Sequence, residues 1–174
     1  MIGMDGLEAR VRRLEDREAI RSLKARYFFA CDSKHVQGVR DCFPAGKVMI
    51  DYGRIGVFDD REQLVEVFER LACHEHIVEM HHGENMQIEL IDAAQARGTC
   101  GLFYHLINTR DGVATQLGAY YQDEYRKLDG EWKIVSTRCV VISTLVMDFA
   151  DGLAKVLFAG RTAPADIDDP TDQA

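Results

Sequence analysis

The sequence predicts an α+β fold in which N-terminal helices cover one face of a strongly bent, antiparallel or mixed sheet. Helical periodicity occurs only in the first part of the chain, whereas residues 96–143 divide into three strands joined by Asp-Gly turns. Along the middle strand, apolar or aromatic residues alternate with polar ones, as expected when one face is buried. A bent sheet closed on one side by helices forms a cone, so we expect an interior pocket lined by inner-face strand residues and buried helix ends.

The first element is a helix over residues 5–31, because apolar residues recur mainly at three- and four-residue steps. Asp16 and Glu18 indicate where the main helix begins after a short leading segment. The last turn is apolar nearly all round, which predicts that this end of the helix is buried. The apolar positions are Leu7, Val11, Leu14, Ile20, Leu23, Tyr27 and Cys31.

Two further helices and a short strand follow. A helix from Val36 to Phe43 is closed by Pro44 and Gly46, and Lys47 to Tyr52 forms the strand. Asp60 begins the third helix, and Gln63 completes a spacing like that of a capping box.

The second half of the chain is predicted to be mostly strand. Residues 74–82 form a loop that contains four of the six histidines, and residues 85–91 alternate as a strand. The three long strands span residues 96–109, 114–128 and 131–143, with Gly101 and Gly118 as bend sites. Residues 146–158 are predicted to form a terminal helix.

Composition limits the classes of function. Residues 1–158 are predicted to form one domain, and residues 159–174 an acidic, disordered tail. The net charge of −8 argues against nucleic-acid binding, and no apolar run is long enough to span a membrane. The N-terminus lacks the apolar core of a signal peptide, and five scattered cysteines without a C-x-x-C pair indicate reduced thiols. We therefore expect a cytoplasmic protein.

Four short motifs mark the chain. They are the helix end Tyr-x-x-x-Cys-Asp-Ser-Lys at residues 27–34, Asp-Tyr-Gly at 51–53, His-His at 81–82 and the closing segment 125–134. Together they resemble the SnoaL-like branch of the nuclear transport factor two-like superfamily over residues 7–148, with details similar to scytalone dehydratase and its bacterial relatives. The superfamily includes dehydratases, isomerases, cyclases, epoxide hydrolases, dioxygenase small subunits and binding modules, so the resemblance specifies fold more closely than function.

The resemblance implies a catalytic set. In the dehydratase-like relatives, an aspartate at the position of Asp32 pairs with a histidine that here is His82, with His81 as the alternative. A carboxylate bonded to an imidazole fixes its tautomer and stabilises the imidazolium, which suits a general base. Tyr52 corresponds to a tyrosine that polarises a substrate oxygen, and His105 falls near a second histidine of the dehydratase.

The same resemblance suggests residues that bind the substrate: Tyr27, His81, Ala119, Tyr121 and Asp123. Ala119 and Tyr121 replace small polar residues of the dehydratase, which argues against an identical substrate, and Tyr121 and Asp123 offer a replacement hydroxyl and carboxylate. A ketosteroid-isomerase-like reading would instead use Asp51 or Asp123 as the base.

Two functions remain open. The first is a cofactor-independent lyase or isomerase acting on a small cyclic or aromatic ketone; the second is a non-catalytic ligand-binding protein or a module resembling dioxygenase small subunits. No glycine-rich phosphate loop or dinucleotide fingerprint is present, and the spacing of the histidines at 74, 76, 81 and 82 matches no zinc motif, so neither a cofactor nor a metal is predicted. We expect a homodimer or homotrimer formed through the outer sheet face, which is predicted to carry Gln116, Tyr120, Gln122 and Trp132.

Overall fold

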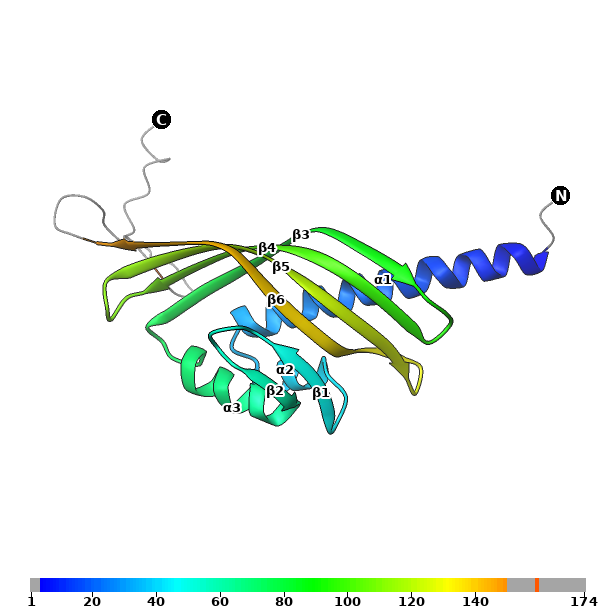
Figure 1. Ribbon diagram of the computed structural model, residues 1–174, viewed down its shortest axis with the longest axis horizontal. Helices are drawn as coiled ribbons and strands as arrows, with labels where there is room; N and C mark the ends of the chain where they lie inside the picture. Colours follow the sequence, from blue (N-terminus) through cyan, green and yellow to red (C-terminus); the bar gives the residue numbers. More distant parts are fainter. Residues whose placement is uncertain (1–3, 150–158, 160–174) are drawn as a thin grey trace, which may run out of the picture.

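The computed structural model describes residues 4–149 and 159, and it contains three helices packed on a mixed six-stranded sheet (Figure 1). The strand order is β2-β1-β6-β5-β4-β3, and every neighbouring pair is antiparallel except β1 and β6. The sheet is bent but not closed, and α1 crosses its inner face (Figure 1). This confirms the α+β class. The elements are α1 (Met4–Asp32), α2 (Val36–Asp41), β1 (Lys47–Asp51), β2 (Val57–Asp60), α3 (Arg61–Ala72), β3 (Ile77–Leu90), β4 (Gln95–Asn108), β5 (Val113–Leu128) and β6 (Glu131–Asp148).

The predicted Asp-Gly turns connect the long strands. Asp129 and Gly130 have φ angles of 50° and 86°, the pair of positive values that a two-residue hairpin turn with matching twist requires. Gly112, with φ of 67°, serves the β4–β5 turn. The alternation predicted for β5 is also present, since its buried and exposed residues alternate from Tyr121 to Arg126.

The predicted loop at residues 74–82 is wrong in its second half. β3 begins at Ile77 and continues to Leu90, with an irregularity between Glu84 and Gln87. The reason is tertiary: β4 is fourteen residues long, and β3 pairs with it along its whole length, from Ile77 opposite Asn108 to Leu90 opposite Ala96. The two adjacent histidines, His81 and His82, therefore point to opposite faces of the sheet.

Two other elements differ from the prediction. β2 at Val57–Asp60 was missed; its last residue caps α3, where the Asp60 carboxylate accepts a hydrogen bond from the Glu62 N–H at 2.8 Å. Residues 146–148 end β6 instead of starting a helix, because they pair with residues 113–115 of β5. The remainder of the predicted terminal helix, residues 150–158, and nearly all of the predicted tail lie outside the described residues.

Helix α1 is continuous, so the predicted separate leading segment is absent. Its N-terminal part extends past the sheet (Figure 1), and Leu7, Val11 and Leu14 are exposed. The six-residue step from Leu14 to Ile20 adds to this exposure, because six residues at about 100° each move the apolar stripe far around the helix axis. The buried stripe begins only at Ile20.

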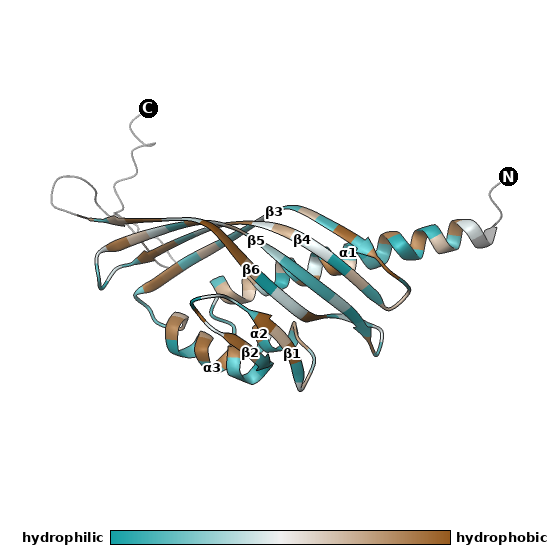
Figure 2. Ribbon diagram, viewed as in Figure 1, coloured by the Kyte–Doolittle hydropathy of each residue, from teal (hydrophilic) through white to brown (hydrophobic). Residues whose placement is uncertain are grey.

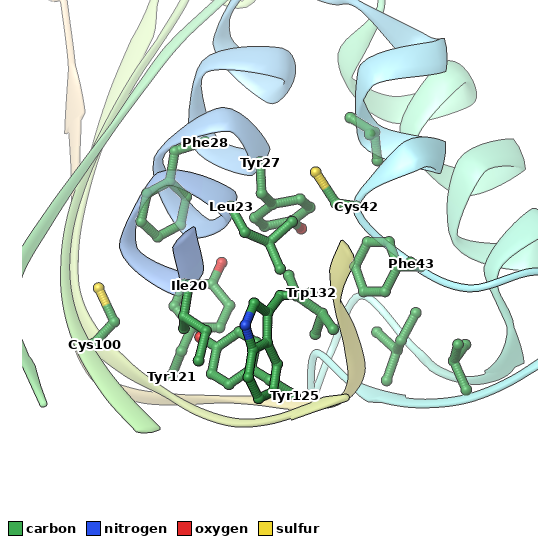
Figure 3. Close-up of a cluster of buried hydrophobic side chains, with 14 of the residues drawn as sticks. Ile20, Leu23, Tyr27, Phe28, Cys42, Phe43, Cys100, Tyr121, Tyr125 and Trp132 are labelled. Atoms are coloured by element: carbon green, nitrogen blue, oxygen red, sulfur yellow. The ribbon is translucent and has the colours of Figure 1, made fainter. Parts of the chain in front are cut away.

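The core lies between the second half of α1 and the inner sheet face. Figure 3 shows side chains of α1 meeting Tyr121, Tyr125 and Trp132 from the sheet, and Figure 2 shows further apolar residues in α3 and in the strands beside it. Trp132 is buried on this inner face, so its predicted place on the outer face is wrong. Its indole N–H donates to the Asp16 carboxylate at 2.8 Å. Burial raises the pKa of Asp16, but hydrogen bonds from Lys127 and Trp132 outweigh it and hold the pKa below its usual value.

All five cysteines are free thiols. Burial raises the pKa of Cys42 to about 11 and also raises the pKa of Cys31, so both remain protonated near neutral pH. Across the described helices, none is long and apolar enough to cross a membrane.

Candidate functional site

Asp32, the last residue of α1, is bonded to His81 of β3. The His81 ring Nδ1 lies 2.6 Å from Asp32 Oδ1, and the His81 backbone N–H is 3.1 Å from each carboxylate oxygen. A carboxylate only accepts hydrogen bonds, so Nδ1 carries the proton and Nε2 keeps the lone pair of a base. The C-terminal end of a helix disfavours a negative charge, and these donors from β3 compensate for that position.

The partner of Asp32 is therefore His81, and the predicted pairing with His82 is wrong. In the ladder with β4, His81 lies opposite Tyr104 and His82 opposite Phe103, so the two rings occupy different faces. His82 is exposed on the outer face. The side chains of His81 and Asp32 are 12% and 21% exposed, which leaves the pair accessible from one side.

Two aromatic rings hold the imidazole. Phe28 stacks on it with ring centroids 5.6 Å apart and planes 10° from parallel, and Tyr104 meets it edge-on at 4.8 Å. His105, the residue predicted from the resemblance, lies on the outer face opposite Met80. A shift of one position along β4 reverses the face, so Tyr104, and not His105, lies beside His81.

The close approach of Phe28 depends on Gly83, two residues after His81. A β-carbon at this position would lie 2.4 Å from the Phe28 ring. We expect Gly83→Ala to displace Phe28 from the imidazole and to lower the free energy of unfolding by about 1–3 kcal/mol, the usual cost of overpacking. Urea unfolding measures this loss. Gly46→Ala is a poor control because its φ is 81°. A β-carbon at Gly101 of the neighbouring strand would meet the Glu84 carbonyl oxygen at 3.1 Å and not Phe28, so Gly101→Ala measures the cost of a tight contact elsewhere in the sheet. An unchanged stability in Gly83→Ala would contradict the role of Gly83.

A pair of hydroxyls lies near Phe28. The oxygens of Tyr27 and Tyr52 are 2.7 Å apart, and the Tyr27 ring is 5.8 Å from that of Phe28. Burial raises the pKa of both Tyr27 and Tyr52 well above the usual value, so both are neutral phenols. One hydroxyl donates to the other, and the Tyr52 hydroxyl also has a hydrogen bond with the Thr137 side chain.

The predicted residues of β5 lie on the inner face. Ala119 faces the interior opposite Leu102, and the Tyr121 ring contacts Tyr52 with centroids 5.9 Å apart. Asp123 is 3% exposed, and hydroxyls donate to both of its oxygens, that of Thr137 at 2.6 Å and that of Tyr125 at 2.7 Å. Its carboxylate is therefore engaged within the protein.

Sequence reasoning missed the cation opposite Asp123. Lys24 is 1% exposed, and its ammonium lies 2.8 Å from Asp123 Oδ2 and 3.6 Å from the centroid of the Tyr121 ring. The signal was available, because Lys24 is four residues after Ile20 and four before Phe28, within the buried stripe of α1. The other predicted alternative base, Asp51, is paired with Arg138 at 3.4 Å near the sheet surface.

A cavity of about 1130 Å³ lies away from this site. It is bordered by the outer flank of α1, by α2 and by the turns that follow β3 and β5, and no predicted site residue lines it. Aromatic side chains occupy the space between α1 and the sheet, where the sequence predicted a pocket. Within the described ranges no three His, Cys, Asp or Glu side chains converge as metal ligands. His74 and His76 stack on each other at 5.1 Å, apart from His81.

Comparison with known proteins identifies the fold. A hexachlorocyclohexane dehydrochlorinase (LinA, type 2) aligns with a TM-score of 0.73 and 18% identity over 83% of this chain and 99% of its own. A proposed scytalone dehydratase from Novosphingobium aromaticivorans aligns with a TM-score of 0.71 and 19% identity over 89% of this chain and 98% of its own. A proposed aromatic ring hydroxylase from the same species aligns with a TM-score of 0.69 and 20% identity over 77% of this chain and 94% of its own. Residues 12–138 match the model of the SnoaL-like domain, so the chain belongs to this family.

Proposed function

We propose that the protein is a cofactor-independent lyase or isomerase in which Asp32 and His81 act as an acid–base pair. The observation that carries this proposal is the 2.6 Å contact between Asp32 Oδ1 and His81 Nδ1. It gives the imidazole a fixed tautomer and a carboxylate that stabilises the charge formed when Nε2 takes a proton. Partial exposure of both side chains lets a small molecule reach them.

The reaction follows from these groups. Nε2 of His81 removes a proton from a carbon next to a carbonyl, and the electrons of the C–H bond form an enolate. A hydroxyl of the Tyr27–Tyr52 pair donates to the developing oxyanion. In an elimination the electrons then form a C=C bond as the leaving group on the adjacent carbon departs; in an isomerisation the proton returns from His81 to another carbon.

The chemistry of the surroundings suggests the substrate class. Phe28 and Tyr104 contact the imidazole and Tyr121 contacts Phe28, and these aromatic surroundings favour a small cyclic or aromatic, ketone-bearing molecule. The proteins of similar fold named for dehydrochlorination and dehydration agree with an elimination, although identities of 18% and 19% support the fold alone.

A second candidate is a non-catalytic ligand-binding protein or a module resembling dioxygenase small subunits. The observation that favours it is the aromatic packing between α1 and the sheet, together with a cavity that lies away from Asp32 and His81. In either case, the outer sheet face is our candidate for a homodimer or homotrimer contact. Met80 and Phe103 are 52% and 46% exposed there, near Gln116 and Tyr120.

The test is turnover of three probes by the wild type and by Asp32→Asn. Hexachlorocyclohexane reports chloride release, scytalone reports loss of water, and 5-nitrobenzisoxazole reports proton removal by any suitably placed base. We expect the wild type to exceed Asp32→Asn on at least one probe. Equal rates in both proteins on all three would reject the acid–base pair, and a small molecule found bound by native mass spectrometry would then support the binding protein.

A further inference from the structure

A second charged cluster adjoins the Asp32–His81 pair. The Lys34 ammonium lies 2.5 Å from Glu79 Oε1, and the Tyr104 hydroxyl donates to Glu79 Oε2 at 2.7 Å. The side chains of Lys34 and Glu79 are only 14% and 7% exposed. Glu79 is on β3 two residues before His81, so both side chains point to the same face, and Tyr104 contacts both.

The backbone at Lys34 points to a role for its side chain. Lys34 directly follows the last turn of α1 with φ of 59°, and the next N–H, that of His35, donates to the Ala30 carbonyl at 2.8 Å. Glycine is the usual residue at such a helix end because a β-carbon disfavours positive φ. A lysine kept in this conformation places its ammonium on a nearly buried carboxylate, which a glycine could not do.

We propose that Lys34, Glu79 and Tyr104 form a positioning unit that orients His81, in which the Lys34 charge offsets the effect of the Glu79 charge on the imidazole. The proposal rests on the proposed function of His81 as a base. Glu79 fixes the Tyr104 hydroxyl and so holds that ring against the edge of the imidazole. The charges of Glu79 and Lys34 offset each other, so the unit adds a carboxylate next to the imidazole without an excess of negative charge.

Few other groups near His81 can change charge. Burial, reinforced by the neighbouring Glu79, raises the pKa of Tyr104 and the pKa of Cys31 far enough that both remain neutral through the physiological range. Among the described groups around the ring, Asp32, Glu79 and Lys34 carry charges. The Lys24 ammonium, paired with Asp123, lies 5.2 Å from the centroid of the Phe28 ring that stacks on His81. The titratable or charged groups around the ring are Cys31 and Asp32 from α1, Lys34 from the turn after it, Glu79 from β3 and Tyr104 from β4.

The ion pair of Lys34 and Glu79 allows a test in which substitutions of its two partners shift the titration of His81 in opposite directions. Glu79→Gln removes a negative charge, which disfavours the imidazolium, so the ring of His81 should titrate at lower pH, by roughly half a pH unit or more. Lys34→Met removes a positive charge and should move the midpoint to higher pH by a similar amount. The double variant should return close to the wild type, and Lys34→Arg should restore it.

The measurement is the NMR titration of the His81 ring signal, identified by its loss in His81→Gln. Glu89→Gln is the matched control. Glu89 also lies on β3 and forms an ion pair with a basic residue, Arg97, but both side chains are more than half exposed. It should leave the midpoint unchanged. Shifts of the same sign in Glu79→Gln and Lys34→Met, or no shift in either, would overturn the proposal. If Glu79→Gln does not fold, the titration midpoint of His81 in Lys34→Met is compared with that in Lys34→Arg. Equal midpoints in these two variants would overturn the proposal.

This titration needs no substrate. If Asp32→Asn turns over all three probes as fast as the wild type, the proposed reaction is rejected. The coupling between the charges of Lys34, Glu79 and His81 is then still judged by the NMR titration. Conversely, an active Asp32–His81 pair with unchanged midpoints would remove the positioning unit alone.

Discussion

His81→Ala should lower turnover of a responsive probe by about 10²–10⁴-fold, the usual contribution of a general acid or base. Asp32→Asn should cause a loss of similar order, because an amide neither stabilises the imidazolium nor enforces the tautomer with Nε2 free. The two residues act as a unit, so the double variant should be little slower than either single variant.

The matched control is the neighbouring histidine. His82→Ala removes the same side chain one position further along β3, but this ring is exposed on the outer face and should change the rate by less than about twofold. The measurement is the steady-state rate with 5-nitrobenzisoxazole. The variants are compared after circular dichroism shows that they are equally folded. A large loss of activity in His82→Ala together with full activity in His81→Ala would show that His82, and not His81, is the base.

Asp123→Asn should produce a large loss of stability. The variant leaves the Lys24 ammonium buried without a counter-charge, and removing one partner of a buried ion pair costs about 3–5 kcal/mol. The aromatic rings of Tyr121, Phe28 and Tyr27 lie within 3.6–5.4 Å of Lys24 Nζ and offset only part of this cost. Urea unfolding should show the midpoint moving to lower concentration with little change in slope.

The double variant Lys24→Met/Asp123→Asn separates the charge effect from packing. It removes both charges while keeping a long side chain and an oxygen that can accept from Thr137, so it should recover much of the lost stability. The exposed pair of Arg97 and Glu89 provides the comparison, and breaking it should cost no more than about 1 kcal/mol. A double variant as unstable as Asp123→Asn would show that the ion pair is not the source of the loss.

Local signals predicted much of the fold. The Asp-Gly turns, the alternation in β5 and the Asp60 cap of α3 depend on neighbouring residues, and each was visible in the sequence. The beginning of β3 at Ile77 was not visible in the sequence, because its polar, histidine-rich residues form a strand only when β4 supplies hydrogen bonds. The exposure of Leu7, Val11 and Leu14 likewise depends on where the sheet ends beneath α1.

The sequence by itself determined that the helices come before the long antiparallel strands, the family, and Asp32 as one member of the candidate pair. Only the tertiary structure decided its partner, because a choice between adjacent residues of a strand is a choice of face, and pairing with β4 sets that face. The same pairing placed Tyr104, and not His105, on the face of His81. The packing of α1 on the sheet brought Lys34 to Glu79 and Lys24 to Asp123, partners 45 and 99 residues away along the chain. Contacts between such distant residues leave no local pattern, since they arise only when α1 packs on the sheet.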